Sequence, residues 1–80
     1  MRYVNVVLRL IEYDNLGLSS FYRLMLPSGV DYELTCPNDS TLSYYLRRLK
    51  VGSEFEVSEL VSKDNIEVSQ ITVNGIKYRF

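Results

Sequence analysis

Side chains able to carry out acid–base or nucleophilic chemistry are few in this sequence. It has no histidine and one cysteine, so a Ser-His or Cys-His nucleophile pair and a zinc site are not expected. Glu54 and Glu56 share one face of a predicted strand, as a catalytic carboxylate pair would. Outward glutamates on an edge strand are also a common protection against aggregation, and no other residues suggest a substrate pocket. We therefore expect no enzyme activity, no catalytic residues, no cofactor and no metal.

Cys36 and the hydropathy of the chain indicate the compartment. Cys36 lies on the apolar side of its predicted strand, which is typical of a small core residue and not of a reactive thiolate. A lone cysteine forms no internal disulfide. No apolar stretch could span a bilayer, and the first residues alternate instead of forming the apolar segment of a signal peptide. These features predict a cytoplasmic protein without membrane contact.

Aromatic and arginine side chains that alternate along the first two predicted strands form the first candidate binding surface. Bases of single-stranded nucleic acid stack on aromatic rings for about 1–3 kcal/mol each, and guanidinium groups hold phosphates. The same residue types are enriched in protein interfaces, and small sheets often bury both faces. The outward surface is predicted to comprise Tyr3, Asn5, Arg9, Tyr13, Phe21, Arg23 and Met25.

A second, basic patch is predicted where a helix ends and the last strand runs. Cations in the last turn of a helix also offset its dipole, so they do not by themselves indicate a ligand. The formal net charge of −1 argues against strong polyanion binding, which usually requires a basic excess, unless charge is segregated by face. The patch would comprise Arg47, Arg48, Lys50, Lys77 and Arg79.

These residues are positioned by short elements within one predicted domain, residues 1–80. Alternation in the first strand places Val4, Val6, Leu8 and Leu10 on an apolar face, opposite the aromatic and arginine residues. Both faces of segment 66–73 carry apolar residues, so its core face stays open. The predicted strands are 2–14, 21–26, 30–36, 53–61, 66–73 and 76–80.

One helix is predicted between the third and fourth strands. Its apolar face repeats at helical spacing through Leu42, Tyr45, Leu46 and Leu49. Asp39 or Ser40 can cap its first turn, and Gly52 can serve as the residue after its end. We expect a helix of about three turns that needs a sheet to pack against.

Two hairpins have clear turn signals. Residues 27–29, Pro-Ser-Gly, connect the second and third strands. Asn74-Gly75 connects the last two strands and predicts a type I′ turn, which needs positive φ at both central positions.

The order of three strands, a helix and two or three strands resembles that of an oligonucleotide-binding (OB) barrel. A long first strand suits that fold, because it must serve both halves of the curled sheet. The predicted class is therefore α+β, mostly β: a five- or six-stranded antiparallel curled sheet or OB-like barrel with one short helix. The alternatives are a β-grasp-like arrangement, if 21–26 and 30–35 form one bent strand, and a generic sheet with one helix on a face.

Two functions fit this reading. The first is a small binding domain that contacts single-stranded DNA or RNA through the aromatic and basic face. The second is a protein-interaction module that acts as a homodimer, an accessory subunit or an inhibitor of a larger machine, through that face or an open sheet edge. The near-zero charge favours the second, whereas the Tyr/Arg pattern and the OB-like order favour the first. A compact chain of this style is typical of phage- or virus-encoded small proteins.

Overall fold

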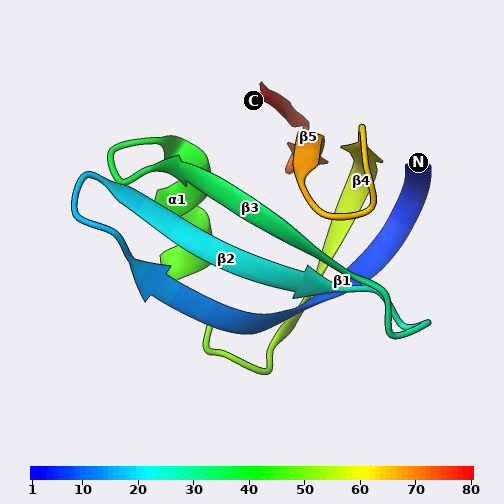
Figure 1. Cartoon of the computed structure of the whole chain (residues 1–80), viewed down its shortest axis with the longest axis horizontal. Helices are drawn as coiled ribbons and strands as arrows, with labels where there is room; N and C mark the ends of the chain where they lie inside the picture. Colours follow the sequence, from blue (N-terminus) through cyan, green and yellow to red (C-terminus); the bar gives the residue numbers. More distant parts are fainter.

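The structure is a computed structural model that describes residues 1–80 and consists of six strands and one helix (Figure 1). The strands are β1 (Arg2–Asn15), β2 (Ser19–Met25), β3 (Asp31–Pro37), β4 (Glu54–Ser62), β5 (Val68–Val73) and β6 (Ile76–Arg79), and the helix is α1 (Thr41–Arg47).

All six strands form one sheet in the order β3-β2-β1-β4-β5-β6, and every neighbouring pair is antiparallel. The long β1 sweeps through both halves of the sheet in Figure 1, pairing with β4 over its first part and with β2 over its last part. A parallel bridge between Glu33 and Glu67, in which the Glu33 N–H donates to the Ile66 carbonyl at 2.7 Å, links the two ends of the curl.

The result is a curled half-barrel with the helix between the third and fourth strands, so the predicted class and its OB-like element order are confirmed. The β-grasp-like alternative is wrong, because β2 and β3 are two antiparallel strands joined by the Pro27–Gly29 turn and not one bent strand.

The core lies on the inner side of the curl, where a cluster of 16 buried residues draws on β1 to β5 and α1. Leu42 and Leu46 of the helix are buried in it, with Tyr45 and Leu49 packed against it, as the helical spacing predicts. Cys36 is a buried free thiol, and burial raises its pKa, so its predicted role as a core residue is confirmed. On β5 the buried positions are Val68, Ile71 and Val73, which identifies its core face.

The helix begins as predicted and ends early. The Ser40 hydroxyl accepts a hydrogen bond from the Ser43 N–H at 3.1 Å and caps the first turn. At the other end the Arg48 and Leu49 N–H groups bond three residues back, to Tyr45 and Leu46, and such tightened bonds terminate helices. The helix therefore has two turns instead of three. The prediction that Gly52 follows its end is wrong, since Gly52 belongs to the separate turn that leads into β4.

Two irregularities in β1 change which side chains face the core. Asn5 has a left-handed backbone with φ of 52° in mid-strand, and the pairing with β4 skips it. Ile11 is an extra residue in the pairing with β2, a β-bulge. Because each irregularity reverses the alternation of sides, the single apolar face predicted for β1 is wrong: Leu8 and Leu10 are buried, but Val4 is exposed.

The last hairpin follows its sequence signal. Val73 pairs with Ile76, and the two connecting residues, Asn74 and Gly75, have φ of 52° and 78°. Positive φ at both positions is the signature of the predicted type I′ turn, which is confirmed.

Candidate functional site

The outer side of β3, β2, β1 and the first half of β4 is a continuous surface of cross-strand neighbours. Met25 lies between Arg9 and Asp31, Arg23 between Glu12 and Glu33, and Phe21 beside Asp14. On the other side of β1, Arg9 pairs with Glu54 and Val7 with Glu56. We call this surface the acidic face, comprising Val7, Arg9, Glu12, Asp14, Phe21, Arg23, Met25, Asp31, Glu33, Glu54 and Glu56.

Arg23 is the centre of an ion-pair network on the acidic face. Its guanidinium lies 3.2 Å from Glu12, 3.2 Å from Glu33 and 3.9 Å from Asp31. The hydrogen bond that Arg23 donates to Glu12, and then the one that it donates to Glu33, raise the pKa of Arg23 above its ordinary value. Carboxylates occupy the directions in which this guanidinium could grip a phosphate.

Arg9 is also engaged within the protein. Its guanidinium lies 3.7 Å from the Glu54 carboxylate and donates to the Gly52 carbonyl at 3.4 Å. Both arginines of the predicted binding surface are therefore flanked by acidic side chains, and the charge of the surface is negative where a basic surface was expected.

The prediction that Tyr3 and Tyr13 point outward is wrong. The half-buried Tyr3 packs against the core, and its hydroxyl lies 2.9 Å from that of Tyr32. Tyr13 pairs with the buried Tyr22, with ring centroids 5.3 Å apart. Both rings lie on the inner side of the sheet because of the two irregularities in β1, and Tyr13, near the end of the strand, is still 39% exposed there. Neither ring belongs to the outer surface with Arg9 and Arg23.

The other predicted residues of this surface divide into two groups. Phe21 and Met25 are half-buried on the acidic face with Arg9 and Arg23, and the Arg23 guanidinium lies 5.4 Å from the centre of the Phe21 ring. Asn5 lies away from them and lines a cavity beside β4. Of the three aromatic residues predicted for this surface, only Phe21 lies on it.

The predicted basic patch is split by the fold. Arg47 donates to the carbonyls of Asn38, at 3.0 Å, and Ser43, at 3.4 Å, and Arg48 lies 5.3 Å from the centre of the Tyr44 ring. The start of the helix contacts β6 through Thr41 and Tyr78. Arg47 and Arg48 lie at the other end of the helix, which is the end farther from β6. Lys50 follows them in the next turn.

The cations of β6 have a different neighbour, which the sequence analysis missed. Arg79 lies opposite Gln70 and Gln70 opposite Val61, which pairs with Arg2 on β1. Arg2 forms a 2.6 Å ion pair with Glu59, and this bond lowers the pKa of the Glu59 carboxyl. Lys77 lies in the same row as Glu59. Arg2, Lys77 and Arg79 thus share the outer side of the second half of the sheet, in rows that do not include the residues of the acidic face.

Sequence reasoning also missed the carboxylates that surround Arg23. Asp31 and Glu33 alternate on one side of β3, so a signal for them was present. Glu12 and Asp14 lie beyond the bulge at Ile11, and only strand pairing shows that they meet Arg23 and Phe21.

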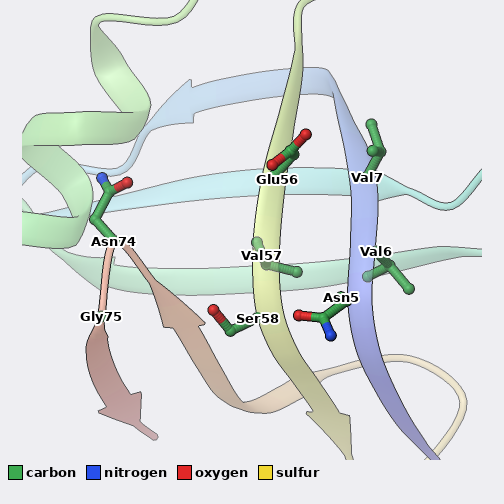
Figure 2. Close-up of a pocket in the computed structure, with 8 residues that line it drawn as sticks. All are labelled: Asn5, Val6, Val7, Glu56, Val57, Ser58, Asn74 and Gly75. Atoms are coloured by element: carbon green, nitrogen blue, oxygen red, sulfur yellow. The ribbon is translucent and has the colours of Figure 1, made fainter.

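A cavity of about 390 Å³ lies beside β4 (Figure 2). In Figure 2, Asn5 lies between β1 and β4, whereas the Asn74–Gly75 turn lies on the other side of β4. On its side away from β1, β4 pairs with β5 only from Glu59 onward, so Glu54–Ser58 have no strand beside them on that side. The lining residues are Asn5, Val6, Val7, Glu56, Val57, Ser58, Asn74 and Gly75.

Comparison with protein-family models, curated proteins and solved structures finds no match for this chain. The one helix lacks the length and apolar character needed to cross a membrane. Within the structure no group of three or more potential metal-binding side chains is present.

Proposed function

We propose that this protein is a protein-interaction module whose acidic face binds a lysine- or arginine-containing segment of a partner protein. The observation that carries the proposal is the pairing of Arg9 and Arg23 with carboxylates, which leaves the surface with an excess of acidic groups. Charge complementarity selects partners and accelerates their encounter.

Apolar side chains on the two middle strands of the acidic face, β1 and β2, support a protein partner. Val7 is 36% exposed, and Phe21 and Met25 are half-buried. These three side chains are interspersed with charged ones on this face, and such a mixture of apolar and charged groups is typical of protein interfaces. A nucleic acid would instead meet carboxylates where its phosphates must lie, with one half-buried ring available for stacking.

The experiment measures fluorescence anisotropy with three labelled probes at low and physiological salt. They are a peptide of alternating lysine and valine, its counterpart of glutamate and valine, and an oligo-dT strand. We expect the lysine peptide alone to bind, with an affinity that falls as salt rises because exposed charges are screened. Binding of oligo-dT in preference to the lysine peptide would overturn the proposal in favour of nucleic acid.

The matched variants change charge and little else. The double variant Asp14→Asn/Asp31→Asn removes two carboxylates from the acidic face, and we expect about fivefold weaker binding of the lysine peptide. The double control Asp39→Asn/Glu67→Gln removes the same number of carboxylates at exposed positions outside this face and should leave binding unchanged. Equal loss in both variants would show that only net charge matters, which contradicts a specific surface.

Solution mass completes the test, because the partner could be a second copy of this chain. A dimer that dissociates in the double variant would mean that the acidic face is a self-interface. We expect the protein to be a monomer.

We also expect it to act in the cytosol, with Cys36 reduced. Its origin in a phage or virus stays a prediction.

A further inference from the structure

The unpaired stretch of β4 has backbone groups available for a ligand. Leu10 exchanges hydrogen bonds with residues 52 and 53, so its backbone faces β4. Along an antiparallel pair, residues whose backbone groups bond to the neighbouring strand alternate with residues whose backbone groups point away from it. Phe55 and Val57, which lie opposite Leu8 and Val6, therefore also bond to β1. The N–H and C=O groups of Glu54 and Glu56 therefore point away from β1, toward the edge that β5 leaves open.

The cavity extends from Asn5–Val7 of β1 across β4 to the Asn74–Gly75 turn beside this edge, and it supplies further polar groups. The Ser58 and Asn5 side chains lie at one end, and the Asn74–Gly75 turn forms the opposite wall (Figure 2). Asn5 and Asn74 are the only non-glycine residues with positive φ, and both line it. Amide side chains can donate to and accept from a peptide backbone at once.

The charge at the edge indicates the chemistry of the occupant. Glu54 and Glu56 are exposed on the outer side of β4 and belong to the acidic face. An extended segment beside β4 would place alternate side chains next to these carboxylates, where lysine or arginine is favoured. Open sheet edges are a recognised binding mode for extended peptides, with affinity from main-chain hydrogen bonds and specificity from alternate side chains.

We infer that the partner's basic segment binds as an added strand along Glu54–Ser58 of β4, in the cavity bounded by the Asn74–Gly75 turn. This inference rests on the proposed function and names the binding mode of the same partner. The acidic face contributes charge, and the β4 edge contributes the main-chain hydrogen bonds that fix the direction and position of the segment.

The test compares the lysine–valine peptide with the same peptide N-methylated at every backbone amide, which keeps the side chains and their charge but removes the donors. We expect about tenfold weaker binding after methylation, the effect of losing two or so main-chain hydrogen bonds. In parallel, amide hydrogen exchange followed by NMR should show that the Glu54 and Glu56 amides exchange rapidly in the free protein and slowly with bound peptide. The Val57 amide, which faces β1, should be slow in both states.

A variant pair tests the cavity itself. Asn74→Gly keeps the positive φ of the turn and removes the amide side chain, so we expect severalfold weaker binding in a protein with an intact hairpin. Asn65→Gly changes an exposed asparagine outside the cavity and should leave binding unchanged.

The outcomes separate this inference from the proposed function. If both peptides bind equally and the exchange of Glu56 is unaffected, the added strand is overturned while the acidic face stands. If neither peptide binds, the proposed function fails and takes this inference with it. If the Glu56 amide is already protected in the free protein and the mass is that of a dimer, a second copy occupies the edge and the inference is overturned.

Discussion

The phenol hydroxyl groups of Tyr3 and Tyr32 lie 2.9 Å apart on the inner side of the sheet, with their rings edge to face. The contact joins β1 to β3, which are not neighbours in the sheet, and so links the two halves of the curl. The hydrogen bond that the neutral Tyr32 hydroxyl makes with Tyr3, aided by burial, raises the pKa of Tyr32 to about 12. This pair gives the first prediction.

Tyr3→Phe should lower the free energy of unfolding by about 0.5–1.5 kcal/mol, since it deletes one hydrogen bond and keeps the ring. It should also lower the pKa of Tyr32 toward its ordinary value of about 10. Because the pKa is raised in the folded state, the stabilisation is complete below about pH 10 and is lost as the pH rises toward the folded value. Urea unfolding at several alkaline pH values and tyrosinate absorbance measure both effects.

Tyr44→Phe, at an exposed ring, is the control for this pair and should change neither quantity. A Tyr3→Phe protein with wild-type alkaline titration would contradict the hydrogen bond.

Asn5 should tolerate glycine and reject a β-branched residue. Its φ of 52° lies in the left-handed region, which costs an ordinary L-residue roughly 1–2 kcal/mol and a β-branched residue more. We expect Asn5→Val to lose about 2 kcal/mol or more of unfolding free energy and Asn5→Gly to stay within about 0.5 kcal/mol of wild type. Chemical denaturation of the two variants measures this difference, and equal stability would mean that β1 is regular at this position.

The Arg23 network should make stability depend on salt. Arg23→Gln leaves Glu12, Asp31 and Glu33 facing one another without their shared cation. We expect a lower urea midpoint than wild type at low salt and a smaller difference at high salt, where charges are screened. Arg48→Gln, outside any ion pair, is the control, and an equal effect of both variants would argue that only net charge matters.

Asp64 should contribute to stability only above the acid range. Its carboxylate accepts the N–H groups of Ile66 and Glu67, both at 2.8 Å, and these bonds lower the pKa of Asp64. A carboxyl with a lowered folded pKa stabilises fully above its unfolded value of about 3.9 and loses this contribution as pH falls through the folded value. The turn also holds Ile66, whose carbonyl bonds to β3 across the open side of the curl.

Asp64→Asn should therefore flatten the loss of stability between about pH 5 and pH 2, because the amide has no charge to titrate. Urea unfolding across this range, with Asp39→Asn as the matched control, measures it. An unchanged acid profile in Asp64→Asn would show that the carboxylate does not hold the turn.

Local features of the chain were readable from its sequence. The Ser40 cap, the Asn74–Gly75 turn and the apolar face of the helix depend on residues within a few positions of one another. The order of elements followed from the same signals, and with it the curled sheet and the place of the helix. The candidate site was predicted less well: Arg9, Phe21, Arg23 and Met25 were placed on one surface, but its charge and the direction of the tyrosines were not.

The sequence by itself determined which segments form strands, turns and helix, because hydropathy period and turn chemistry act over short distances. Only the tertiary structure decided which side chains share a surface. One left-handed residue at Asn5 and one extra residue at Ile11 exchange the faces of β1, and no period-2 pattern reveals them. The acidic face likewise exists because Glu12 and Glu33 flank Arg23 across strand pairings, and such pairings are set by the packing of the whole sheet.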